Sequence, residues 1–192
     1  TYAAGRLAEL MKAQLAELNF LDVEFEIAVQ RMEEPGADGA DDVEFLISTN
    51  PGESLKPLGR IASGGELSRV MLAIKTVLAD QDAIETVIFD EIDTGISGRT
   101  AQKVSEKLAL IGRSRQVICI THLAQLASMA DSHYCIEKRA VDGSTQTGIR
   151  LLDEQESVEE LARILGGAQI TDAVIDNARE MKKLAQKFKA HR

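Results

Sequence analysis

The sequence predicts an α/β protein in which helices flank a parallel sheet, with a helix and a β-hairpin preceding that sheet. Short apolar runs at 87–89 and 117–121 alternate with amphipathic helical patterns, which is typical of parallel strands joined by crossover helices. Earlier in the chain, alternating hydrophobicity at 23–29 and 43–47 indicates strands with one buried face. The apolar spacing over 1–18 is that of one helical face.

The composition is that of a globular protein with one core. The chain has 192 residues, of which 44% are hydrophobic and 28% are charged. We expect no membrane attachment, because no apolar run reaches the length of a membrane span and no signal peptide opens the chain. Cys119 lies in an apolar run and neither cysteine has metal-ligand spacing, so we expect a buried thiol in a reducing, cytoplasmic compartment.

The net charge of −9 argues against extensive electrostatic binding of nucleic acid by this chain alone. A basic cluster nevertheless lies near the C-terminus, and we interpret it mainly as a solvated helix face. It is the one local candidate for a DNA contact. The cluster comprises Lys182, Lys183, Lys187, Lys189 and Arg192.

The N-terminal helix has a spacing that would suit the end of a coiled-coil arm. We place this arm at 1–20 and separate it from a lobe at 21–192. Between the two alternating strands lies the acidic, turn-rich stretch 31–42, which predicts a flexible solvent loop. A long amphipathic helix is expected from Leu67 to Leu78, directly after a Ser-Gly-Gly sequence.

Helices and strands are predicted to alternate through the rest of the chain. Ser157 and Glu160 predict a capping box for a helix that ends at Gly166-Gly167. The other predicted elements are a helix after Ser97, a short helix at 123–130, a strand at 132–137 paired with 147–152, and a last helix from about Thr171 that docks onto the domain.

The start of the long helix is the first candidate site. Glycines let the backbone approach a ligand closely, and a helix N-terminus offers free N–H donors and a positive dipole end. A serine hydroxyl adds a further donor, so the arrangement would suit a phosphate. The residues alone leave a plain helix cap with a tight turn equally open. The four residues are Ser63, Gly64, Gly65 and Glu66.

Two apolar strands end in residues that suit nucleotide chemistry. Asp90 could hold Mg²⁺, and Glu91 could orient or deprotonate a water that attacks a phosphate. His122 could reach a γ-phosphate. Taken singly, the acids could merely begin a loop and the histidine could be a structural hydrogen-bonder. Together with the helix start they would open on the same edge of a parallel sheet, so we interpret them as one nucleotide site.

One part of an ATP site is missing from the chain. A P-loop requires a G-x-x-x-x-G-K-[ST] stretch that wraps the β-phosphate. The nearest glycine spacings are Gly59 to Gly64 and Gly143 to Gly148, and neither is followed by the lysine and the hydroxyl residue. The sequence therefore predicts half of an ATP site.

Three motifs carry a family resemblance. The stretch SGGELSR resembles the signature of ABC-type ATPases, VIFDEIDTGISG resembles their Walker B strand and D-loop, and ITHLAQLA resembles their switch-histidine loop. From about Val23 onward the chain resembles the SMC-like RecN family of bacterial DNA repair proteins. The resemblance implies the C-terminal lobe of an ABC/SMC-type ATPase head, which folds with an N-terminal Walker A lobe of the same protein.

The resemblance also implies roles for individual residues. Asp90 would help to hold Mg²⁺, Glu91 would be the catalytic carboxylate that acts on water, and His122 would contact the γ-phosphate. Ser97 stands where many ABC proteins have the D-loop aspartate, which leaves the D-loop roles of Asp93 and Ser97 open. The residues that would bind the γ-phosphate of ATP held by the opposite head are Ser63, Gly64 and Gly65, with Glu66 in place of the common signature glutamine.

The implied function is ATP hydrolysis between two heads in DNA double-strand-break repair and recombination. ATP and Mg²⁺ are the implied cofactors. The implied partners are the N-terminal lobe, a second head in a homodimer, and DNA bound by the intact protein in the nucleoid of the cytoplasm. Without Walker A, this chain alone would be inactive.

Two alternatives stay open. The first is a Mg²⁺-dependent, Toprim-like nuclease that uses Glu91 and Asp93 as an acidic pair. It departs from the Asp-x-Asp pattern at Glu91 and leaves the Ser-Gly-Gly sequence without a role. The second is a structural dimerisation module, in which ATP turnover by the intact protein would survive the loss of Ser63 and Glu91.

Overall fold

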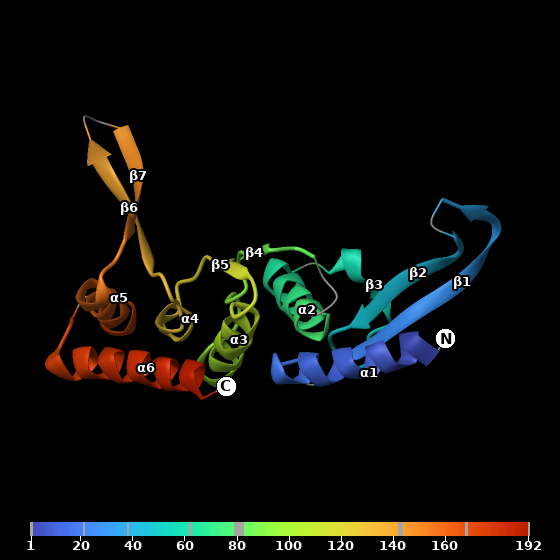
Figure 1. Ribbon diagram of the computed structural model, residues 1–192, viewed down its shortest axis with the longest axis horizontal. Coiled ribbons are helices and arrows are strands. Elements are labelled where there is room, and N and C mark those ends of the chain that lie inside the picture. The colour runs from blue at the N-terminus through green and yellow to red at the C-terminus, as the bar shows by residue number, and fades with distance from the viewer. Residues whose placement is uncertain are drawn as a thin grey trace. The chain divides into compact units, whose positions relative to one another are not determined.

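The protein falls into two compact units, Thr1–Ile120 and Thr121–Arg192, each with its own buried hydrophobic residues (Figure 1). The computed structural model describes residues 2–20, 22–37, 39–61, 63–78, 83–141, 144–167 and 169–191.

The first unit begins with a helix packed against an antiparallel sheet (Figure 1). In the sheet β2 lies between β1 and β3. Phe25 of β1 lies opposite Ile47 of β2, and these side chains are only 2% and 3% exposed. The alternation of apolar residues therefore predicts the buried face correctly. The elements are α1 (Tyr2–Glu17), β1 (Glu24–Gly36), β2 (Gly39–Ser48) and β3 (Lys56–Pro57).

The prediction of a loop at 31–42 is wrong. The strands β1 and β2 continue through this acidic stretch, with a shift of register between Arg31 and Gly36. Arg31 is paired with Asp41 in the ladder, and opposite charges across two strands favour the pairing. Most side chains here are exposed, so the stretch lacks the apolar alternation by which a half-buried strand is identified in a sequence.

The helix predicted over 1–18 is confirmed as α1. Its buried side chains include Met11 and Leu15, which are 1% and 0% exposed. The buried Lys107 of a later helix reaches its C-terminal end, where Nζ lies 2.9 Å from a carboxylate oxygen of Glu17. In this unit α1 packs against β1 and α2 (Gly64–Val77). The assignment of 1–20 to a coiled-coil arm remains a prediction.

The prediction of parallel strands is confirmed, but the parallel sheet is small. Within the described residues the parallel sheet consists of β4 (Thr86–Phe89) and β5 (Gln116–Cys119), joined through α3 (Gly98–Ile111). A short 3₁₀ helix, η1 (Leu58–Arg60), precedes α2. The connection through α3 is the crossover that parallel strands require.

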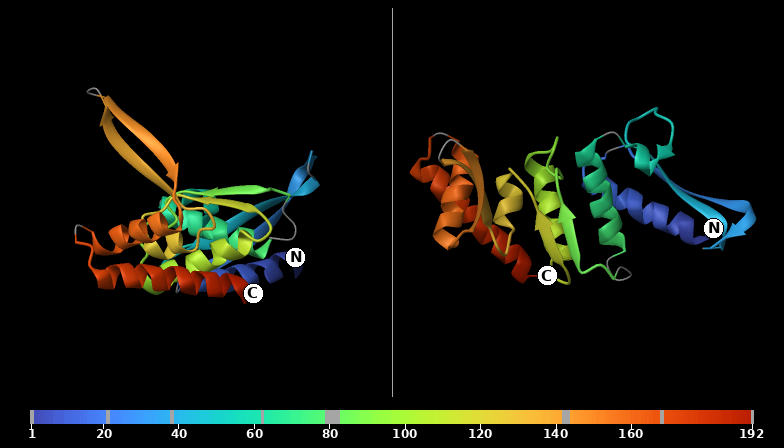
Figure 2. Two further views of the ribbon diagram at one scale, coloured as in Figure 1. Left: turned by 60° about the vertical axis from the view of Figure 1, so that its left-hand side comes forward. Right: turned by 90° about the horizontal axis from the view of Figure 1, so that it is seen from above.

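One face of the β4–β5 pair lies beside α3, as Figures 1 and 2 show from different sides. The other face carries isoleucines that are largely exposed. Ile88, Ile118 and Ile120 are 65%, 43% and 49% exposed. An apolar strand surface of this kind is typical of a sheet that is covered on both faces in the complete fold.

The second unit consists of three helices and an antiparallel hairpin (Figure 1). The predicted pairing of its two strands is confirmed, with Tyr134 opposite Leu151. Side chains of all three helices share one core, which includes Ala124, Leu161 and Ala178. The elements are α4 (Ala124–Ser128), β6 (Tyr134–Val141), β7 (Ser144–Leu151), α5 (Glu154–Gly166) and α6 (Asp172–Ala190).

The capping box predicted at Ser157 and Glu160 is wrong. The N-cap of α5 is Asp153, whose side chain accepts from the N–H of Glu156 at 2.8 Å, while Glu156 accepts from the N–H of Asp153 at 2.9 Å. Ser157 lies inside the helix, where its Oγ is 2.8 Å from Nδ1 of His133. The capping-box pattern therefore occurs twice, at Asp153 and Glu156 and again four residues later at Ser157 and Glu160. The helix uses the first of the two.

Part of the basic cluster on α6 is engaged within the second unit. Nζ of Lys189 lies 2.7 Å from a carboxylate oxygen of Asp131, and Nζ of Lys182 donates to Oγ of Ser157 at 2.9 Å. Lys183 and Lys187 are exposed, and Arg192 lies outside the described residues. Among the described residues, no helix is both long enough and apolar enough to cross a membrane.

Replacing Asp153 by alanine should destabilise the second unit by about 1 kcal/mol, because the first turn of α5 loses its side-chain acceptor. Thermal unfolding of this unit, followed by circular dichroism, should show a Tm lower by roughly 4–8 °C. The control is Asp153→Asn, which keeps a capping oxygen and should stay close to the wild type. Equal Tm values for the alanine and asparagine variants would contradict the assigned cap.

Candidate functional site

The N-terminal end of α2 (residues 63–66), which we call its mouth, is a regular helix start. Ser63 is its N-cap, with extended backbone angles, and its Oγ accepts from the N–H of Glu66 at 3.4 Å. Ser63 is therefore a helix cap, as one of the two interpretations of this stretch predicts. The N–H groups of Gly64 and Gly65 belong to the first turn, which offers them no intrahelical acceptor. The helix start therefore keeps backbone donors at its positive end.

The two glycines bring α2 into contact with the segment that follows β4. A Cβ at Gly64 would overlap the carboxylate of Glu91. A Cβ at Gly65 would lie only 3.0 Å from the carbonyl oxygen of Glu91 and 3.0 Å from the Cβ of Thr94. A side chain at Gly65 would require these neighbours to move by a few tenths of an ångström. The glycines are therefore needed for close packing as well as for any approach by a ligand.

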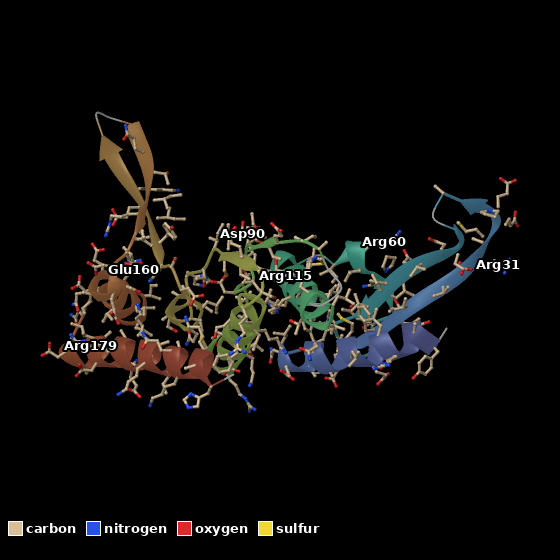
Figure 3. All side chains as sticks on the ribbon, viewed as in Figure 1. Arg31, Arg60, Asp90, Arg115, Glu160 and Arg179 are labelled. Atoms are coloured by element: carbon tan, nitrogen blue, oxygen red, sulfur yellow. The ribbon has the colours of Figure 1, made fainter. Side chains whose placement is uncertain are left out.

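Asp90 and Glu91 leave β4 as two exposed acids, and Asp90 lies beside the β4–β5 strands (Figure 3). Oδ1 of Asp90 accepts from the N–H of Glu91 at 2.9 Å. Glu91 has φ +56°, a left-handed conformation that a non-glycine residue adopts rarely and that often marks functional sites. The chain reverses there, because the N–H of Thr94 donates to the carbonyl of Glu91 at 3.0 Å.

The two possible D-loop residues differ in their surroundings. Asp93 is only 4% exposed, so its carboxylate is buried within the turn. Ser97 is exposed and is the N-cap of α3, although its side chain makes no capping hydrogen bond. Its carbonyl oxygen accepts from the N–H groups of Thr100 and Ala101 at 3.2 and 3.4 Å. The structure thus gives Ser97 a backbone role at the start of a helix.

Two residues that sequence reasoning did not single out hold this segment to α2. Oγ of Ser68 donates to the carbonyl of Asp90 at 2.8 Å, and a guanidinium nitrogen of Arg69 donates to the carbonyl of Thr94 at 2.9 Å. Arg69 lies on the buried side of α2, together with Val70 and Ala73. An arginine on the apolar face of an amphipathic helix is the signal that could have identified it.

Cys119 ends β5 close to these acids. Burial raises the pKa of its thiol to about 12, with the negative charges of Asp93 and Asp90 adding to the effect. A neutral thiol of this kind is a poor nucleophile and a poor metal ligand. Cys119 is half-buried, so the prediction of a buried thiol is only partly correct.

His122 belongs to the second unit, so its distance from the two acids is not defined by this structure. It is exposed and stands in the loop between β5 and α4. Next to it, Oγ1 of Thr121 accepts from the N–H of Leu123 at 3.0 Å. Within the first unit the structure brings the helix start Ser63, Gly64, Gly65 and Glu66 against the turn with Asp90, Glu91 and Asp93, while Ser97 lies beyond this turn at the start of α3.

The donor set for a metal is small. No group of three or more His, Cys, Asp or Glu side chains among the described residues could hold a metal ion by itself. Mg²⁺ in nucleotide sites is commonly bound through one or two carboxylates together with substrate phosphates and water. The exposed carboxylate of Asp90 is a donor of that kind. The site therefore fits Mg²⁺ that arrives with a phosphate ligand.

No protein-family profile matches the chain. Individual relatives do match it, among them several DNA repair proteins RecN. The relative from Halalkalibacterium halodurans is 44% identical over 183 residues, which is 95% of this chain and 32% of the relative. The relative from Bacillus subtilis is 50% identical over 151 residues, or 79% of this chain and 26% of the relative. The chain thus spans about a third of the length of these relatives.

Solved structures of SMC heads share the fold. The Smc head domain with a coiled coil and joint from Pyrococcus yayanosii has a TM-score of 0.55 and 21% identity, over 80% of this chain and 28% of that one. The Smc head domain with an extended coiled coil from Pyrococcus furiosus has a TM-score of 0.51 and 20% identity, over 86% of this chain and 37% of that one. These similarities concern the fold. The identities of 42–50% to RecN proteins decide the family, and the chain belongs to the RecN family of DNA repair proteins, as a segment with an SMC-like head fold.

Proposed function

We propose that this chain is the C-terminal lobe of an SMC-like ATPase head and supplies half of an ATP site in a DNA repair protein. The observation that carries the proposal is the contact between the mouth of α2 and the acid pair after β4. Gly64 lies directly against the carboxylate of Glu91. Free N–H donors at a helix end suit a phosphate, and acids at the end of a parallel strand suit Mg²⁺ and the attacking water, so the contact joins two parts that phosphoryl transfer uses.

Each residue has a distinct part in the proposed site. ATP with Mg²⁺, when bound, supplies the phosphoryl group and neutralises part of its charge. Asp90 binds the metal through its exposed carboxylate, and Glu91 orients the attacking water and accepts its proton. His122 donates a hydrogen bond to the γ-phosphate. At the mouth of α2, Ser63 supplies a hydroxyl and Gly64 and Gly65 supply N–H groups to the phosphate of a second head.

The Walker A residues come from another lobe in this proposal. Both units have an open apolar surface that supports the docking of such a lobe. In the first unit this surface is the exposed face of β4–β5 with Ile88 and Ile118. In the second it is one face of the β6–β7 hairpin, where Ile136 and Ile149 lie opposite each other and are 56% and 69% exposed. Large exposed apolar residues that cluster on a strand face indicate a partner surface.

The proposed partner at α2 is a second copy of the head. As the resemblance to SMC-like heads implies, the mouth of α2 and Glu91 of one chain serve different ATP molecules in this proposal. A homodimer with ATP between the heads satisfies both, because a two-fold axis gives each nucleotide one mouth and one acid pair. DNA repair is the function that the names of the relatives carry, and DNA contacts belong to the intact protein.

The alternatives from the sequence fit the geometry less well. A Toprim-like nuclease would use Glu91 and Asp93 together on one metal. Asp93 is 4% exposed, whereas Glu91 is exposed, so the two carboxylates do not share one open surface. A structural dimerisation module would leave the exposed acids at Asp90 and Glu91 without a purpose.

The direct test is calorimetric titration of Mg²⁺-ATP into this chain, first alone and then with the separately expressed N-terminal lobe of the same protein. We expect no binding by the chain alone, because it has no loop that wraps the β-phosphate, and binding with turnover after mixing. Tight binding by the chain alone would mean that a phosphate-holding loop lies within it, and the half-site proposal would fail.

Replacing Gly64 by alanine should slow ATP turnover by the complete protein by about 100-fold. The added methyl group displaces the carboxylate of Glu91, and misplacing a catalytic group by about 1 Å costs this much. The fold should survive, because the atom that must move is the end of a flexible side chain.

The matched control is Gly59→Ala, since a Cβ at Gly59 meets no atom within 4 Å. It should leave turnover within about two-fold of the wild type. Steady-state ATPase assays, with thermal unfolding of each variant, check the pair. Equal turnover by Gly64→Ala and the wild type would show that the contact with Glu91 does not matter for catalysis.

A further inference from the structure

Arg69 is a buried charged residue beside the first unit's site, in which the carboxylate of Asp93 is also buried. The residue is 8% exposed and lies on α2, one turn beyond the glycines. One guanidinium nitrogen donates to the carbonyl of Thr94 at 2.9 Å, and the guanidinium carbon lies 5.4 Å from the centre of the Phe20 ring. The side chain thus joins three segments: α2, the turn after β4 and the connection between α1 and β1.

The burial of this charge is unfavourable by itself. Desolvation lowers the pKa of Arg69, and the nearby negative charge of Glu66 only partly opposes that effect. Nε of the same side chain has no hydrogen-bond partner among the residues that the structure describes. A buried charge with incomplete hydrogen bonding is usually less stable than a well-packed apolar residue. Core packing alone therefore does not account for an arginine at this position.

Ser68 completes the attachment of the turn. Its hydroxyl donates to the carbonyl of Asp90 at 2.8 Å, at the beginning of the segment whose end is held by Arg69. Gly65 lies close against the carbonyl of Glu91, within the same segment. The first two turns of α2 therefore hold the segment 90–94 at both ends. Glu91, with its left-handed backbone, lies within that segment.

We propose that Arg69 is a positioning residue that holds the turn 90–94 to α2 and to the connection between α1 and β1, and thereby sets the place of the Glu91 carboxylate. The role is proposed for the ATPase site described above and rests on that function. Arg69 touches no reacting atom. The contact with Phe20 extends the attachment to the connection between α1 and β1, so the position of the turn depends on that connection as well as on α2.

Hydrogen–deuterium exchange of this chain without nucleotide tests the attachment independently of ATP hydrolysis. The informative amides are those of Thr94 and Ile96, which donate within the turn to Glu91 and Asp93 at 3.0 and 3.4 Å. With Arg69→Met, which keeps length but removes the donor, these amides should exchange roughly ten-fold faster. The amides of the β1–β2 ladder should keep their wild-type rates.

Two further variants separate positioning from general stability. Arg69→Lys keeps one donor and the cation over Phe20, so it should restore exchange to within about three-fold of the wild type. Arg6→Met, at an exposed position of α1, is the matched control and should change nothing. Unchanged exchange at Thr94 and Ile96 in Arg69→Met would overturn the proposal. So would a uniform increase over the whole first unit, because that is the result of a structural role alone.

The consequence for catalysis is measured in the complete protein. Arg69→Met should lower kcat at least about ten-fold and leave KM for ATP within about two-fold, since the acid is misplaced and the phosphate contacts remain. Arg69→Lys should recover most of kcat. If the wild-type protein had no ATPase activity, the proposed function would be wrong. The exchange experiment would still test whether Arg69 holds the turn 90–94. A raised KM with unchanged kcat would contradict the positioning role.

Discussion

The close approach of α2 to the turn after β4 is the contact on which the geometry of the first unit depends. Gly65 has the carbonyl of Glu91 and the Cβ of Thr94 within 3.0 Å of the place where a side chain would begin. Two hydrogen bonds, from Ser68 and Arg69, then hold the same turn at its two ends. A helix start without side chains and a turn with a left-handed residue are each unfavourable alone. Packed together, they fix where the acids after β4 lie.

This contact explains how the two parts of the proposed half-site are arranged. The N–H donors at the mouth of α2 and the carboxylate of Glu91 are neighbours within one chain, and in the proposed dimer they serve different nucleotides. The hydrogen bonds of Ser68 and Arg69 make the position of one depend on the position of the other. In the proposed dimer, the binding of a partner's ATP and the placement of the chain's own acid are therefore linked by packing, without any long-range path.

The sequence predicts most of the fold because apolar periodicity is a property of buried faces. The helices α1, α2, α3 and α6 and the parallel pair β4–β5 all have such faces, and all were predicted. The extension of β1 and β2 through 31–42 was missed because its side chains are exposed and its stability comes from the ladder. Asp90, Glu91 and the glycines could be identified from residue type and order alone. The hydrogen bonds of Ser68 and Arg69 could not, because their acceptors are carbonyl oxygens of a distant turn; the sequence shows only that Arg69 lies on the apolar face of a helix.

The central claim, that the mouth of α2 serves the nucleotide of a second head, is tested most directly with mixed dimers of the complete protein. Ser63→Arg blocks the mouth and Glu91→Gln removes the base, and each homodimer should be inactive. Co-expression gives dimers in which one site combines an intact mouth from one chain with an intact acid from the other, so ATPase activity should return to about a quarter of the wild type. A mixture as inactive as either parent would show that the mouth and the acid serve the same nucleotide, and the account would be wrong.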